Sequence, residues 1–159
     1  MRIAFGSDER THLTDVVIEE LKQRGHAVEI YGPPAGTQEL GPDVARQVAE
    51  RVASGAVDQG IVCCWTGTGV SIAANKVPGV RAALCTDAEI ARGARLWNDA
   101  NVLALSLRLT SEAVAREILD AWFSTRPSQS EDDLQCIRRV REIERHYTAA
   151  GEPIGARAG

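Results

Sequence analysis

Short apolar runs alternate with longer amphipathic segments along this chain. The runs are rich in branched residues and end at glycine or polar positions, as buried strands do; they cover residues 2–6, 27–32, 59–64, 80–85 and 101–107. The segments between them repeat apolar residues at spacings of three and four, so that Leu13, Val17 and Leu21 share one helical face. The pattern predicts five strands, each followed by a helix.

Regular alternation of strands and helices predicts an α/β fold, with one parallel sheet and helices on both faces. A further helix that carries Leu134, Ile137, Val140 and Tyr147 follows a polar loop. Residues 1–147 are expected to form a single domain, and residues 148–159 a disordered tail. Ligands of such sheets bind at the carboxyl ends of the strands. The candidate ligand-binding loops are therefore GSDER, CWTGTG and LRL, which follow the first, third and fifth strands.

Composition narrows the class of protein. The 159 residues are 44% hydrophobic and 25% charged, which is ordinary for a globular domain. A net charge of -4 without a basic cluster, and an aromatic content of 4%, argue against nucleic-acid binding. No apolar run has the length of a membrane span, and the first ten residues lack the features of a signal peptide. We expect a cytoplasmic protein that binds neither nucleic acid nor membranes.

Familiar cofactor and metal motifs do not fit. The sequence GTGVSI lacks the third glycine of a dinucleotide-binding motif and follows the third strand instead of the first. Lys76 is out of frame for a P-loop. Cys63 and Cys64 are adjacent and cannot easily chelate, and the three histidines are scattered, so we expect no metal site.

The segment CWTGTG has the composition of a ligand-binding loop between a strand and a helix. Cys64 stands where the third strand is expected to end, and the glycines let a ligand approach the backbone. A thiol in that place is expected to have a lowered pKa, beside N–H groups that could hold an oxyanion. That pair of features suits removal of a proton next to a carbonyl group. Cys64 could equally be a small buried hydrophobe, as most free cysteines are.

Longer motifs resemble the type B ribose-5-phosphate isomerases and the related galactose-6-phosphate isomerase subunits. SIAANKVPGVRAALC followed by NDANVLAL is highly specific to that family, and IAFGSD, VASG and RRV add to a likeness that covers about residues 2–147. The resemblance implies a Rossmann-like three-layer sandwich with a five-stranded parallel sheet and an extra C-terminal helix. It implies aldose–ketose isomerisation of a sugar phosphate through an enediolate, without metal or organic cofactor. It also implies a homodimer or tetramer whose active sites are shared between chains.

The resemblance also assigns roles to single residues. Cys64 matches the catalytic base, and Thr66 matches the hydroxyl that assists at the substrate oxygens. Gly67 and Gly69 match the loop that holds the enediolate. The other matches are substrate ligands: Asp8 for a sugar hydroxyl, Asn98 in the ND pair, and Arg108 and Arg139 for the phosphate.

The chain departs from the family pattern around this site. Glu9 stands where a histidine is expected, Trp65 replaces the glycine after the catalytic cysteine, and Trp97 replaces the histidine thought to open the furanose ring. We place these three among the substrate-binding residues. Three other positions also differ: Gly41 replaces a tyrosine, and Gln135 and Cys136 replace an arginine and a histidine. These departures predict an altered substrate range, with a tetrose phosphate favoured over ribose 5-phosphate.

Each of these residues also has a structural interpretation. Asp8 could cap the following turn or helix, and Asn98 could end a helix in the left-handed conformation. The two arginines could be solvated surface charges, and the two tryptophans could pack in the core or at a dimer contact. Glu9 could pair with Arg10 or with the partner chain. Two other functions stay open: isomerisation or epimerisation of a non-phosphorylated sugar, and a catalytically silent subunit of the same family.

Overall fold

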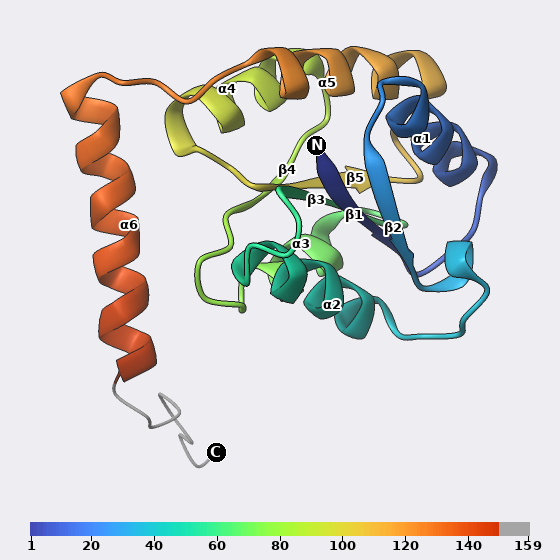
Figure 1. Cartoon of the computed structure of the whole chain (residues 1–159), viewed down its shortest axis with the longest axis horizontal. Coiled ribbons are helices and arrows are strands. Elements are labelled where there is room, and N and C mark those ends of the chain that lie inside the picture. Colours follow the sequence, from blue (N-terminus) through green and yellow to red (C-terminus); the bar gives the residue numbers. More distant parts are fainter. Residues whose placement is uncertain (150–159) are drawn as a thin grey trace.

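The computed structural model describes residues 1–149, which form a five-stranded sheet between two helical layers (Figure 1). The strands are β1 (Arg2–Ser7), β2 (Ala27–Tyr31), β3 (Gln59–Cys64), β4 (Ala82–Leu84) and β5 (Val102–Ser106). Their order is β2-β1-β3-β5-β4, and every neighbouring pair is parallel. The predicted α/β sandwich with five parallel strands is confirmed.

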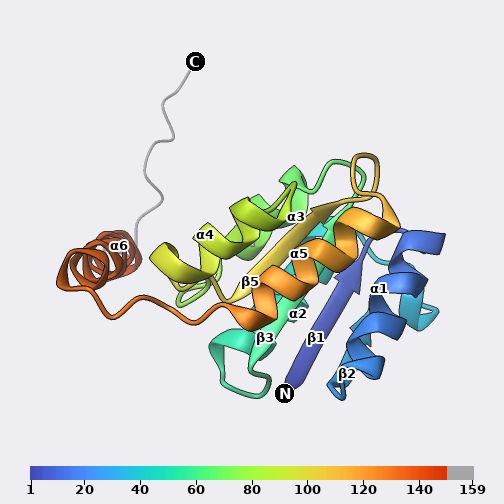
Figure 2. The same ribbon diagram turned by 90° about the horizontal axis from the view of Figure 1, so that it is seen from above.

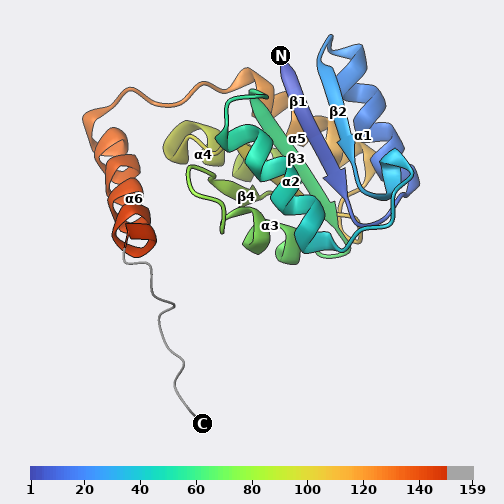
Figure 3. The ribbon, with the colours of Figure 1, turned by 60° about the horizontal axis from the view of Figure 1, so that its bottom comes forward.

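Helices cover both faces of the sheet. One layer contains α1 (His12–Gln23), α4 (Ala88–Asn98) and α5 (Glu112–Ser124), which lie side by side in Figure 2. The other layer contains α2 (Gly41–Ala53) and α3 (Thr68–Ala74) (Figure 3). Alternate strand residues serve the two layers, so Cys63 packs with the first and Cys64 with the second.

The last helix, α6 (Glu131–Ala149), stands apart from both layers at the β4 edge of the sheet (Figures 1 and 3). Ile137 is buried, and the backbone N–H of Gly79 donates to the Glu144 carboxylate at 2.9 Å. Val140, Ile143 and Tyr147 remain about half exposed. A hollow of about 660 Å³ lies between this helix and the sheet edge, so α6 presents apolar surface that residues 1–149 leave uncovered.

Element boundaries differ from the expected ones in a few places. Helix α3 begins at Thr68, two residues before the predicted start, so Gly69 lies inside its first turn. Asp87 caps α4, and Ser111 caps α5. Helix α6 continues through Ala149, and the rest of the expected tail, residues 150–159, lies outside the described residues. Within residues 1–149, no helix is both long enough and apolar enough to cross a membrane.

Candidate active site

The carboxyl ends of β1, β3 and β5 lie next to one another at one edge of the sheet. The strand register pairs Ser7 with Cys63, and Cys64 with Ser106. Asp8 follows Ser7 directly and is therefore level with Cys64. The structure thus brings Asp8, Cys64 and the loop after β5 together, as expected for a sheet of this kind.

The loop after Cys64 needs a glycine at one position. Gly67 has φ 74°, and a β-carbon there would lie 2.5 Å from Cδ1 of Leu84 and 2.9 Å from the carbonyl carbon of Leu105. Both the left-handed backbone and the lack of space exclude a side chain. Apart from its chain neighbours and the backbone of its own helix, no atom of the described residues lies within 4 Å of a β-carbon built on Gly69, so that position has no steric need for glycine.

Hydrogen bonds join this loop to the segment that follows β5. The carbonyl oxygen of Cys64 accepts from the N–H of Gly67 at 3.2 Å and of Leu107 at 3.0 Å. The carbonyl oxygen of Trp65 accepts from the N–H of Arg108 at 2.9 Å and from the Ser106 hydroxyl at 3.0 Å. These bonds fix the backbone beneath Trp65 and Arg108, whose side chains are exposed.

The hydroxyl of Thr66 lies on the open side of this loop. It is hydrogen bonded to the hydroxyl of Thr68 at 2.7 Å, and both residues are exposed. The pair therefore faces the space above the carboxyl edge, where a ligand would bind.

The two adjacent cysteines have different surroundings. Cys63 is 1% exposed, and burial raises the pKa of its thiol far above the ordinary value. Burial also raises the pKa of Cys85, at the end of β4, to about 12. Both thiols therefore stay protonated at neutral pH and cannot act as bases. Cys64 is 7% exposed at the very end of β3, which leaves it the better placed thiol at this edge.

Asp8 lies between the end of β1 and the start of α2. A β-carbon on Gly41 would lie 2.9 Å from Oδ2 of Asp8, so the small residue at position 41 makes room for this carboxylate. The other oxygen, Oδ1, is buried and accepts no hydrogen bond from any described residue. Burial, followed by the charge of Glu9, raises the pKa of Asp8. A ligand hydroxyl would satisfy this oxygen.

The structure contradicts two structural interpretations, of Asp8 as the cap of α1 and of Glu9 as the partner of Arg10. Thr11 caps α1 and accepts from the N–H of Thr14, so Asp8 is not the helix cap. Arg10 pairs with Asp15 at 3.0 Å and not with Glu9, which is exposed beside Asp8.

The other predicted site residues lie elsewhere in the same chain. Trp97 and Asn98 end α4, which runs back from the carboxyl edge over about 16 Å. Arg139 lies on α6, where its guanidinium pairs with Glu142 at 2.6 Å and its side chain is 72% exposed. One chain does not bring these three residues to Cys64.

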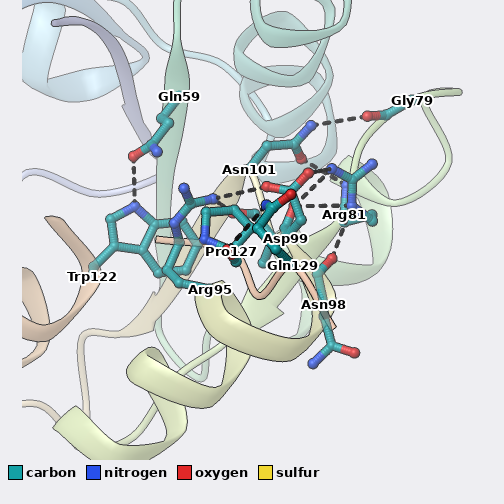
Figure 4. Close-up of polar contacts among 11 residues, drawn as sticks. Gln59, Gly79, Arg81, Arg95, Asn98, Asp99, Asn101, Trp122, Pro127 and Gln129 are labelled. Atoms are coloured by element: carbon teal, nitrogen blue, oxygen red, sulfur yellow. Dashed lines mark hydrogen bonds and ion pairs between the residues drawn. The ribbon is translucent and has the colours of Figure 1, made fainter. Parts of the chain in front are cut away.

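A partly buried charge cluster, missed in the sequence, holds the end of α4 (Figure 4). Asp99, with φ 44°, is the left-handed residue that ends the helix, so the interpretation of Asn98 as that residue is wrong by one position. Arg81 donates to the carbonyl oxygens of Asn98 and Asp99 at 3.0 and 2.9 Å. Arg95 is buried, with its guanidinium 5.4 Å from the Trp122 ring. The Asn98 side chain points away from this cluster and is exposed.

Comparison with known proteins identifies the family of this chain. Residues 3–143 match the family described as Ribose/Galactose Isomerase. The chain belongs to the ribose/galactose isomerase family. Membership places the protein among the sugar-phosphate isomerases, as its motifs implied.

Individual relatives carry different substrate names. The chain is 40% identical to D-erythrulose-4-phosphate isomerase of Pectobacterium atrosepticum, over 77% of this chain and 82% of that protein. It is 42% identical to ribose-5-phosphate isomerase B of Escherichia coli, over 76% and 82% of the two chains. Ribose-5-phosphate isomerase B of Clostridium thermocellum superposes with a TM-score of 0.86 at 42% identity, covering 92% of this chain and 99% of that one. The sequence identities to these relatives are therefore too similar to distinguish a four-carbon from a five-carbon substrate.

Proposed function

We propose that this protein interconverts the aldose and ketose forms of a short sugar phosphate, preferring a four-carbon sugar to ribose 5-phosphate. The observation that carries the proposal is the meeting of Asp8, Cys64 and the Gly67 loop at the carboxyl edge of the sheet. A second copy of the chain completes each site. Neither a metal nor an organic cofactor takes part.

Cys64 acts as the base in this proposal. Its thiolate removes the proton from the carbon next to the carbonyl group, and the electron pair forms the carbon–carbon double bond of an enediolate. The same thiol returns the proton to the neighbouring carbon, while Thr66 assists at the two oxygens. Because the N–H of Gly67 is already bonded to Cys64, the N–H groups of the first turn of α3 are the candidates for holding the enediolate oxygen.

The second copy supplies Trp97, Asn98 and Arg139. These residues lie away from Cys64 in their own chain, and the side chains of Asn98 and Arg139 are exposed. The half-exposed apolar residues of α6 and the hollow beside them offer surface that a second copy would cover. The proposed assembly is a homodimer at least.

The two tryptophans support a short substrate. Trp65 is 57% exposed beside Cys64, and Trp97 is 49% exposed. Both are bulky, and an indole N–H is a donor that does not titrate near neutral pH, so Trp97 cannot carry a ring-opening proton. A tetrose phosphorylated on its terminal hydroxyl cannot close a furanose, because the oxygen required is esterified. Such a substrate needs no ring-opening group.

A turnover panel tests the proposal. Erythrose 4-phosphate and ribose 5-phosphate are each compared with the unphosphorylated sugar, and kcat/KM is measured for all four. We expect the tetrose phosphate to be preferred by about tenfold or more. Activity confined to unphosphorylated sugars would support the alternative isomerase or epimerase, and no turnover at all would support a silent subunit. The cytoplasmic location and the lack of nucleic-acid and membrane binding stay predictions from the sequence.

A further inference from the structure

Gly93 lies in the middle of α4, one turn before Trp97, and is buried beneath its indole ring. A β-carbon on Gly93 would lie 2.7 Å from Cζ3 and 2.9 Å from Cε3 of Trp97. Contacts of that length do not occur in practice, and the atoms belong to a rigid ring. Even an alanine at position 93 would therefore displace the indole.

The backbone gives no other reason for this glycine. Gly93 is not among the residues with positive φ, and glycine destabilises a helix interior relative to alanine. A residue that costs helix stability and makes no turn is explained by the ring that rests on it. Helical side chains point back toward the preceding turn, which is the direction that brings Trp97 over Gly93.

Arg92 makes the second contact with this ring. Its guanidinium carbon lies 5.5 Å from the centre of the Trp97 ring, a cation–π distance. Glu89, one turn earlier, holds that guanidinium at 2.9 Å. Glu89, Arg92 and Trp97 thus form a chain of contacts along one side of α4, which limits the rotamers open to the indole.

The rest of the ring is open. Trp97 is 49% exposed and borders a hollow of about 470 Å³, together with Ala83, Ile90 and Asn98. The Trp97 ring, held in one orientation next to the exposed amide of Asn98, forms a rigid boundary of this hollow.

We propose that Gly93 and Arg92 are positioning residues that hold the Trp97 indole flat along α4, and that the ring held in this way limits the length of the sugar that the site accepts. The inference rests on the proposed function, in which Trp97 enters the site of the other chain. Because α4 lies on one side of the ring, an added β-carbon can only push the indole away from the helix and toward the bound sugar.

Fluorine NMR reads the ring position without any substrate. The protein is labelled with 5-fluorotryptophan, and its three signals are assigned with Trp65→Phe, Trp97→Phe and Trp122→Phe. We expect Gly93→Ala to shift the Trp97 signal and to leave the Trp122 signal unchanged. Arg92→Gln, a change at the helix surface, should broaden the Trp97 signal, and Arg92→Lys should restore part of it. An unchanged Trp97 signal in both Gly93→Ala and Arg92→Gln would overturn the positioning role.

Steady-state kinetics test how the ring position affects substrate specificity. In Gly93→Ala we expect KM for ribose 5-phosphate to rise about tenfold more than KM for erythrose 4-phosphate, with kcat changed less. The same substitution made in a Trp97→Ala background should leave the ratio of the two kcat/KM values unchanged, because the ring that transmits the effect is missing. An equal change in both backgrounds would overturn the limit on sugar length.

The two readouts separate this inference from the proposed function. If the wild-type protein turns over neither sugar phosphate, the proposed function and the limit on sugar length both fall. The fluorine signals would still decide whether Gly93 and Arg92 hold the ring.

Discussion

The carboxylate of Asp99 accepts a hydrogen bond from Arg81 at 2.9 Å and thereby ties the end of α4 to the residue before β4. Arg95, from α4 itself, approaches the other oxygen of the same carboxylate at 3.5 Å. Burial lowers the pKa of Arg95, and the nearby Asp99 carboxylate offsets part of that effect. These two contacts of Asp99 fix the end of α4, where Trp97 and Asn98 lie.

Removing this carboxylate should destabilise the fold. Asp99→Ala removes the carboxylate that pairs with two guanidinium groups. It also places an alanine, which has no side-chain hydrogen bond, at φ 44°, so we expect a loss of about 2–4 kcal/mol in the free energy of unfolding. Asp99→Asn tolerates the left-handed backbone and loses only the charge, so it should cost less. Urea unfolding measures both. The control is Arg46→Ala, whose partners Asp43 and Glu50 are exposed; a loss there equal to that of Asp99→Ala would contradict the argument.

Much of the fold could be predicted from the sequence, and the reasons are local. Apolar runs and amphipathic stripes mark the residues that are buried. In a parallel sheet covered by helices on both faces, this burial pattern closely follows the strands and helices. The role of Asp99 depends instead on Arg81, which reaches it from another segment of the chain. The role of Gly93 depends on the rotamer of Trp97, one turn later in α4, which the sequence does not fix. Helix α3 includes the last two residues of the predicted CWTGTG loop, which the sequence does not indicate because threonine and glycine are weak helix formers and only the turn at Gly67 shows where the helix begins.

The candidate site could be predicted only in part, for a similar reason. Strand ends converge in any parallel sheet, so the meeting of Asp8 and Cys64 follows from the strand order. The position of α6 cannot be predicted in the same way. The apolar stripe of Ile137, Val140 and Ile143 indicates that the helix packs against something, but it does not identify the packing partner. The roles of the site residues remain predictions.

Cys64→Ala should abolish exchange of solvent deuterium into the substrate, with a loss of at least about a hundredfold. The reason is the position of this thiol at the end of β3, next to the loop that would hold the enediolate. Cys63→Ala is the matched control, because its buried thiol stays protonated and faces the opposite helical layer. Retained exchange in Cys64→Ala together with lost exchange in Cys63→Ala would show that the wrong cysteine has been assigned.

Mixed dimers test whether the site is shared. Co-expressed Cys64→Ala and Arg139→Ala chains should recover about a quarter of wild-type activity, because half of the dimers are mixed and each mixed dimer has one intact site. Cys64→Ala co-expressed with Asp8→Ala should recover nothing, since both changes fall in the same half of the site. Sedimentation gives the assembly state, and full activity in a monomer would rule out sharing.

Asp8 should make stability depend on pH. Its pKa is raised above the ordinary value of 3.8, by burial first and by Glu9 second, so the folded protein holds this proton more tightly than the unfolded chain. The stabilisation is therefore complete below pH 3.8 and is lost as pH rises through the folded pKa. Asp8→Asn should be more stable than wild type at neutral pH, and the difference should vanish in acid. Thermal unfolding across this range measures it, and Glu9→Gln should reduce the difference; a gap that widens toward acid pH would refute the direction.

Trp97→His should shift the balance between substrates. An imidazole at this position can donate and accept a proton near neutral pH and is smaller than an indole, so it should raise kcat/KM for ribose 5-phosphate, which is mainly cyclic, more than that for erythrose 4-phosphate. Trp97→Phe is the matched control, because it reduces the bulk without adding a titrating group; a gain confined to the histidine variant assigns the effect to ring opening. The competing explanation is that Glu9, exposed beside Asp8, already opens the ring of a larger sugar. If the wild-type protein prefers ribose 5-phosphate and Glu9→Gln removes that activity, the small-sugar proposal is wrong and the Glu9 explanation stands.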